Sequence, residues 1–335
     1  MKLTSLFLAL ALAAPLARAG QSPDEAARFL AGLPVRDATL AALPGWGTHA
    51  ERLSRAWARM DQRQLVKVRA WSAATIPQAN RSSAAVFYLF SGPDFLYAQT
   101  FFPNSSTYIL CGTEPVGTVP DMALMPPAAL DADLENLRRA LETMLTTHYF
   151  ITKDMRADLT RGQVGGTLPI LYVFLARTGC TIHRVSTNAG SAQIDFTGPA
   201  GQRQTLHYFK TDLSNGGGNA PFFAFCKKHA PGMSVVKSAS YLMHDDGFSA
   251  ARNFLLANSS IIVQDDSGIP LRAFDPRRWT VRFCGNYEGP IELFKEHYQP
   301  DLAAAYQRSH PAPLGFSFGY AWQAARGALI VATPQ

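Results

Sequence analysis

The chain has 335 residues, of which 47% are hydrophobic and 17% are charged, and its formal net charge at pH 7 is +6. This composition excludes a disordered chain and provides enough apolar side chains for a large buried core. The basic excess is small and scattered. Its densest run, residues 52–69, alternates with apolar residues as on the solvated face of a helix. Nucleic acid binding normally needs a concentrated basic stripe, so no nucleic acid partner is expected.

The N-terminus predicts a secretory signal peptide. Lys2 precedes an apolar block at residues 6–16, and Ala17-Arg18-Ala19 forms an A-x-A cleavage site. The block is too short to span a bilayer as a helix, although an uncleaved anchor is the alternative. We therefore expect residues 1–19 to be removed and the mature protein to be periplasmic or secreted. No later stretch of 18 apolar residues exists, so no transmembrane segment is expected after cleavage.

The first part of the mature chain is predicted to be helical. A short helix is expected over residues 23–31, with Ser22 as N-cap and Gly32 at its end. Apolar residues at helical spacing predict long helices over residues 49–73 and 130–148. We expect the helical region of residues 20–75 to pack on the remainder, so that residues 20–335 form a single domain.

Short β-branched or aromatic runs, bounded by Gly, Pro, Asp or Asn, predict strands along the rest of the chain. The predicted strands are residues 84–90, 107–112, 205–211, 260–264, 280–285, 316–322 and 328–334. Helices are expected at residues 93–101, 222–228, 247–256 and 300–309. Alternating strands and helices favour an α/β fold with a layered sheet and flanking helices. The last two strands are close in sequence and expected to be antiparallel, which predicts a mixed sheet.

Neither the cysteines nor a G-x-S-x-G match identifies a functional site in this sequence. Cys111, Cys180, Cys226 and Cys284 form no C-x-x-C motif, which leaves one or two disulfides and buried free thiols as equal alternatives. Residues 315–319 match the G-x-S-x-G nucleophile elbow, but no Asp, Glu or His follows Ser317. We therefore expect Ser317 to lie within a strand.

Acidic residues and histidines follow several of the predicted strands. Ligands of open α/β sheets bind outside the carboxyl ends of the strands, so such residues can converge there. The strongest candidates for catalysis are His244, Asp246, Asp265 and Asp266, because about 18 residues and one helix separate the two groups. They would form either a general acid and base pair or part of a metal site.

A divalent metal is the candidate cofactor, with His207, Asp212, His244 and Asp266 as its expected ligands. Its bound water would drive hydrolysis. The alternative is structural. The run from Asp265 to Gly268 also fits a type I turn, and Asp94 fits an acid in the first turn of a helix.

The segment 87–103 is rich in aromatic residues, of which Tyr88 and Tyr97 would be stacking platforms for a glycan if they were exposed. Core packing is the alternative. The runs VFYLFSGPDFLYAQTFFPNSSTYILCGTEPVG, KSASYLMH and QDDSGIP resemble an uncharacterised group of secreted bacterial proteins over most of the mature chain. The resemblance implies a location in the bacterial envelope and carries no activity, fold or catalytic residue.

Two functions therefore remain open at this level. The first is a periplasmic or secreted hydrolase that uses acidic strand-end residues, with or without a divalent metal. The second is a non-catalytic envelope protein that binds a glycan, a lipid or a protein partner.

Overall fold

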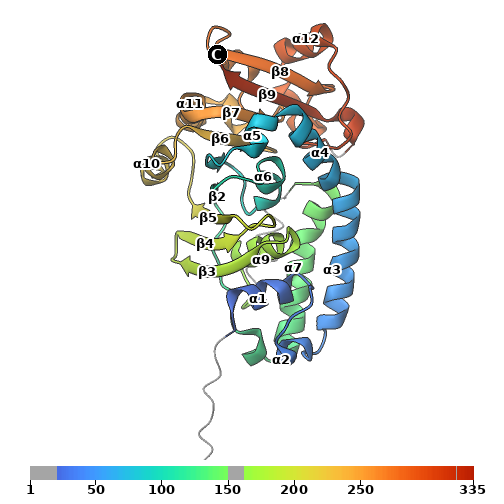
Figure 1. Cartoon of the computed structure of the whole chain (residues 1–335). Helices are drawn as coiled ribbons and strands as arrows, with labels where there is room; N and C mark the ends of the chain where they lie inside the picture. The colour runs from blue at the N-terminus through green and yellow to red at the C-terminus, as the bar shows by residue number, and fades with distance from the viewer. Residues whose placement is uncertain (1–20, 150–161, 322) are drawn as a thin grey trace, which may run out of the picture.

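The computed structural model describes residues 21–149, 162–321 and 323–335, and these residues build one mixed sheet of nine strands between helices (Figure 1). The predicted signal peptide lies outside the described residues. Within them, no helix combines the length and apolar character needed to cross a membrane. The α/β class and the mixed sheet predicted from the sequence are confirmed.

Five parallel strands form the centre of the sheet, in the order β5-β2-β1-β6-β7. Antiparallel strands extend it on both sides, β4 and β3 next to β5, and β9 and β8 next to β7. Their bounds are β1 Val86–Tyr88, β2 Thr107–Gly112, β3 Thr181–Thr187, β4 Ser191–Thr197, β5 Arg203–Lys210, β6 Gly232–Val236, β7 Ser259–Gln264, β8 Trp279–Gly285 and β9 Ala328–Pro334.

Helices cover both faces of the parallel strands. The first face carries α1 (Pro23–Leu30), α3 (Trp46–Met60), α4 (Val66–Thr75), α6 (Phe95–Phe101), α7 (Pro127–Thr147) and α9 (Leu168–Arg177). The second face carries α10 (Ala220–Lys227) and α11 (Ser249–Asn258). Side chains alternate across the central strand, with Val86 and Tyr88 in the first core and Phe87 in the second. The remaining helices are α2 (Ala38–Ala41), α5 (Pro77–Arg81) and α12 (Pro300–Ser309).

Local sequence explains the predicted helices that the structure confirms. Ser22 caps α1 by accepting a hydrogen bond from the Glu25 amide at 3.2 Å. The helix predicted over residues 49–73 corresponds to α3 and α4, which are joined by a π-helical turn at Asp61–Leu65. The fully apolar run of residues 168–176 forms α9, which is buried on all sides between the other helices and the sheet.

One predicted strand is wrong. Residues 316–321 form only a single bridge, between Phe318 and Ala321. Their alternating aromatic pattern arises from packing instead, since the Phe316 ring lies 6.0 Å from Trp71 and the Phe318 ring lies 5.5 Å from Phe101. The antiparallel partners of the last strand are therefore β7 and β8. Strands β3, β4 and β6 were not predicted.

The structure also decides between the alternatives left open for the cysteines and the aromatic segment. All four cysteines are free thiols, and three of them are buried. Burial raises the pKa of Cys111 to about 12 and that of Cys180 to about 11, so both are neutral at physiological pH. Tyr88 and Tyr97 are fully buried in the core and are therefore not exposed stacking platforms.

Candidate functional site

The central strand β1 is the point at which the winding of the sheet reverses. From β1 the chain passes through α6 to β2 on one side, and it later returns to β6 on the other side and continues through α11 to β7. The connections from β1 to β2 and from β6 to β7 run in opposite directions along the sheet, and such crossovers are right-handed. Helices α6 and α11 therefore lie on opposite faces. The loops that leave β1 and β6 therefore diverge, which opens a crevice at their carboxyl ends.

A cavity of about 200 Å³ occupies this crevice. The loops after four parallel strands line it, at residues 90–94 after β1, 112–114 after β2, 211–213 after β5 and 237–240 after β6. Drug-sized ligands fill pockets of about 300–1,000 Å³. This cavity therefore suits a smaller molecule, of the size of an amino acid or a monosaccharide.

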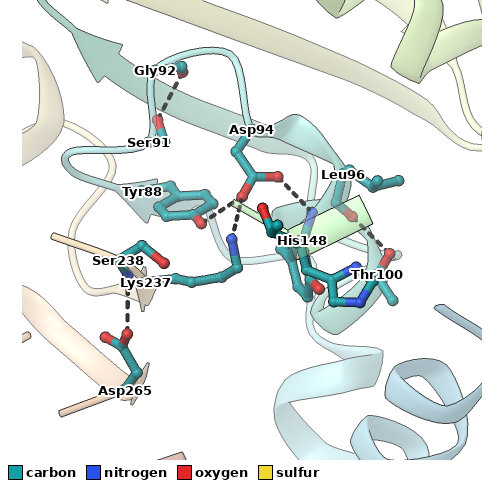
Figure 2. A network of polar contacts seen from close by, with 12 residues as sticks. Tyr88, Ser91, Gly92, Asp94, Leu96, Thr100, His148, Lys237, Ser238 and Asp265 are labelled. Atoms are coloured by element: carbon teal, nitrogen blue, oxygen red, sulfur yellow. Dashed lines mark hydrogen bonds and ion pairs between the residues drawn. The ribbon is translucent and has the colours of Figure 1, made fainter. Parts of the chain in front are cut away.

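A buried ion pair between Lys237 and Asp94 forms part of the cavity wall (Figure 2). Asp94 accepts hydrogen bonds from the Tyr88 hydroxyl at 2.8 Å, from Lys237 Nζ at 3.1 Å and from the Tyr97 amide at 3.3 Å. The last bond makes it the N-cap of α6, one position before the first turn in which the sequence pattern placed it. Three donors therefore satisfy this carboxylate, and it in turn fixes the Lys237 side chain in the cavity wall.

Glu114, at the end of β2, places a second buried carboxylate in the cavity wall. The residue is 4% exposed, and its side chain accepts one long hydrogen bond, 3.4 Å from the Tyr208 hydroxyl. Gly112 is required beside it, because a Cβ there would lie 2.2 Å from Glu114 Oε2. β1 separates β2 from β6, so Glu114 and Lys237 come from strands about 10 Å apart. The cavity thus lies between a poorly satisfied carboxylate and an ammonium group.

The loop after β6 has a strained backbone. Ser238, Ser240 and Tyr241 have φ values of 52°, 51° and 57°, in the left-handed region that non-glycine residues rarely adopt. Among the described residues, the buried Ser238 Oγ has no hydrogen-bond partner. Such strain persists only where surrounding contacts enforce it, and it concentrates at functional sites.

Three side chains behind the loop enforce its conformation. Asp265 accepts a hydrogen bond from the Ser238 amide at 3.1 Å (Figure 2), and Ser267 Oγ accepts one from the Ala239 amide at 2.8 Å. The Tyr320 hydroxyl accepts from the Ser240 amide at 3.1 Å and donates to the Ser238 carbonyl at 2.8 Å. Asp265 is therefore a positioning residue for the cavity rather than part of its lining.

The structure gathers three of the four predicted catalytic residues behind this loop. Fully buried Asp265 also accepts from Ser267 Oγ at 2.6 Å, and its turn is closed by the Gly268 amide at 3.3 Å. Asp266 accepts from the Tyr241 hydroxyl at 2.6 Å, and the Tyr241 ring lies 5.2 Å from that of His244. Asp246 is separate from this group, because its carboxylate is exposed and lies 3.7 Å from Arg252.

The predicted metal ligands do not share one site. His207 lies in β5 against Phe225, and Asp212 is exposed just after the same strand, whereas Asp266 follows β7. Three strands separate β5 from β7, which corresponds to about 19 Å, whereas ligands of one ion lie within about 2.6 Å of it. Among the described residues, no three His, Cys, Asp or Glu side chains are arranged to hold a metal ion. The expectation of one four-ligand site is corrected accordingly.

Burial shifts the titration of the group behind the loop. Desolvation raises the pKa of Asp265, although Ser267 and the Ser238 amide oppose the shift. Desolvation also raises the pKa of Asp266, and the neighbouring Asp265 charge raises it further. Burial, and then the charge of His297, lower the pKa of His244 to about 4, so this imidazole is neutral near pH 7.

The raised pKa of Asp266 gives a pH-dependent prediction. A carboxylic acid whose pKa is raised in the folded state adds to the free energy of unfolding while it is protonated. This contribution is complete below the ordinary pKa of 3.8 and is lost as the pH rises through the raised value. We expect the stability of the native protein relative to Asp266→Asn to fall, on the order of 1 kcal/mol, between about pH 4 and pH 8. Urea unfolding of both proteins measures this difference in the free energy of unfolding. Both proteins have the same histidines, so histidine titration contributes equally to both and does not change the difference. A constant or rising difference would contradict the assignment.

Four polar residues of the cavity lining were not predicted as site residues from the sequence: Asp94, Glu114, Lys237 and Ser238. Asp94 and Glu114 each follow a predicted strand, but neither is among the residues predicted to form the site. Lys237 and Ser238 were missed because no strand was predicted over residues 232–236, where the structure has β6. A strand ending at Val236 would have placed both residues at a carboxyl end.

Comparison with known proteins adds no family to this description. No family model, curated protein or solved structure matches the chain.

Proposed function

We propose that the protein is a hydrolase of the bacterial cell envelope that acts on a small polar substrate in the cavity between β1, β2 and β6. The envelope location rests on the N-terminal signal peptide pattern and on the resemblance to secreted proteins. The observation that carries the proposal is Glu114, a buried carboxylate with one long hydrogen bond that lines a cavity at the switch point of the sheet. The side chain is therefore not occupied by strong donors of the protein, and it lies where ligands of open α/β sheets bind.

Each polar group of the cavity has a role in this proposal. Glu114 is the general base that takes a proton from water as the water oxygen attacks the substrate carbonyl carbon. The Lys237 ammonium stabilises the negative charge that develops on the carbonyl oxygen. Glu114 then returns the proton to the leaving group, so protons balance over the cycle. Ser238 Oγ provides a free hydroxyl for orienting the substrate, and Asp94 positions Lys237.

The substitution Glu114→Gln tests this function, because it keeps the shape of the side chain and removes the base. We expect the mature protein to turn over at least one member of a panel of chromogenic esters and amino acid anilides. Glu114→Gln should lower kcat by about 10²–10⁴-fold. The matched control is Glu51→Gln, the same substitution at an exposed residue outside the cavity, which should leave kcat within about twofold of the native value.

Two results would contradict the proposal. One is a native protein that binds members of the panel in calorimetry but hydrolyses none of them, which is the behaviour of the non-catalytic alternative. The other is a folded Glu114→Gln variant with native kcat.

A further inference from the structure

A second hollow lies on the helical side of the molecule, separate from the cavity at the strand ends. It has a volume of about 570 Å³, and residues of α3, the π-helical turn and α4 line one side of it and residues of α7 the other. Helices α3 and α7 lie side by side (Figure 1). Its lining includes Leu53, Met60, Leu145 and Phe316 as apolar residues. We refer to it below as the α3–α7 groove.

Positive charge dominates the α3–α7 groove. Six basic residues line it against two acidic ones, Glu135 and Glu142; the basic residues are Arg52, Arg59, Arg63, Lys67, Arg138 and Arg139. Both Arg52 and Arg138 pair with Glu135. Within residues 21–149, 162–321 and 323–335, no ion pair engages Arg59, Arg63 or Lys67. These three side chains therefore leave an unneutralised row of cations along one wall.

The spacing of these cations follows from the helix. Arg59, Arg63 and Lys67 are four residues apart along the stretch formed by α3, the π-helical turn and α4. At 1.5 Å per residue, neighbouring cations are about 6 Å apart along the axis and the row extends about 12 Å. Residues four apart lie on the same side of a helix, so the row faces one ligand rather than several.

The floor of the groove is held in place by a buried amide. The Gln64 side chain, 2% exposed, donates hydrogen bonds to the Tyr97 hydroxyl at 2.8 Å and to the Ser317 carbonyl, and it accepts one from the Ser317 amide at 3.1 Å. This network fixes the π-helical turn that carries Arg63. Single π-helical turns within long helices are often found at functional sites. The row of cations is thus presented by a rigid wall.

We propose that the α3–α7 groove binds a ligand that carries two or more phosphate groups. Each phosphate presents several acceptor oxygens, which match the planar donor fork of arginine, and a row of three cations can contact more than one phosphate group of the same ligand. A single carboxylate would neutralise only one of the three free cations. A soluble molecule with several phosphates and the headgroup of a lipid with two phosphates, such as cardiolipin, share this chemistry.

The test uses tripolyphosphate as the probe in calorimetry at low salt, with two variants of equal charge change. The groove variant is Arg59→Gln/Arg63→Gln/Lys67→Gln, and the control is Arg55→Gln/Arg203→Gln/Arg308→Gln, whose residues are exposed and lie outside the groove. We expect the groove variant to weaken binding at least about tenfold and the control to change it less than about threefold. Thermal unfolding should show both variants folded, since all six side chains are exposed.

A second arm distinguishes the two sources of phosphate. Sedimentation with cardiolipin vesicles, whose headgroup carries two phosphates, should show no binding if the ligand is soluble. Vesicle binding that the groove variant loses and the control keeps would assign the phosphate to a lipid headgroup instead. Equal loss in both variants, or no binding of either probe by the native protein, would overturn the proposal.

Discussion

Replacing Lys237 with methionine is expected to lower the free energy of unfolding by about 3–5 kcal/mol. The side chains of Lys237 and Asp94 are 2% and 4% exposed, so the substitution leaves the Asp94 carboxylate buried without its cation. It also removes the ammonium group from its position 4.3 Å above the Tyr97 ring. Urea denaturation at 25 °C measures the change, and loss of hydrolysis should accompany it.

Two further variants separate this effect from a general cost of substitution. Lys295→Met breaks an exposed pair with Glu292 and should change stability little, because solvent screens such pairs. Combining Lys237→Met with Asp94→Asn removes both charges and should be less destabilising than the sum of the two single variants. If Lys237→Met were as mild as Lys295→Met, the buried pair would not hold the cavity wall.

Asp265→Ala is expected to lower the free energy of unfolding by about 2–5 kcal/mol. The fully buried carboxylate accepts hydrogen bonds from the Ser238 amide and from Ser267 Oγ, and each orphaned buried donor costs about 1–3 kcal/mol. The strained backbone at Ser238 would also lose one of its three restraints. Urea denaturation measures the effect.

The conservative variant Asp265→Asn tests whether the residue acts by positioning. Its amide oxygen can still accept from the Ser238 amide, and its NH₂ group can donate to Ser267 Oγ. We therefore expect Asp265→Asn to retain most of the stability and turnover that Asp265→Ala loses. Asp246→Ala, at the exposed fourth predicted residue, should change neither quantity. Complete loss of turnover in a stable Asp265→Asn protein would instead assign the Asp265 charge a direct chemical role.

The fold was predictable wherever the local pattern agreed with the tertiary structure. Strands β2, β7 and β9 were found within about a residue of their ends, because each is a short buried run between turn residues. β6 was missed because Ser234 interrupts its short apolar run of Met233, Val235 and Val236. Residues 316–321 have the alternation of a strand, but the Phe316 and Phe318 rings pack against Trp71 of α4 and Phe101 of α6.

The candidate site was only partly predictable, because its convergence depends on the order of the strands. Acids at strand ends were anticipated, but the sequence does not show that β1 lies between β2 and β6. That order brings Glu114 and Lys237 to one cavity and separates His207 from Asp266. The adjacent acids at residues 265–266 drew attention as a motif, whereas the structure gives Asp265 a supporting position behind the loop.

The claim that the cavity between β1 and β6 is the catalytic site is tested most directly by a crystal structure of Glu114→Gln with its best substrate bound. Because this variant lacks the base, the substrate should remain intact in the crystal. The account predicts a substrate oxygen within hydrogen-bond distance of Lys237 Nζ and contact with the side chain at position 114. A substrate bound in the α3–α7 groove or elsewhere, with the cavity between β1 and β6 empty, would contradict it.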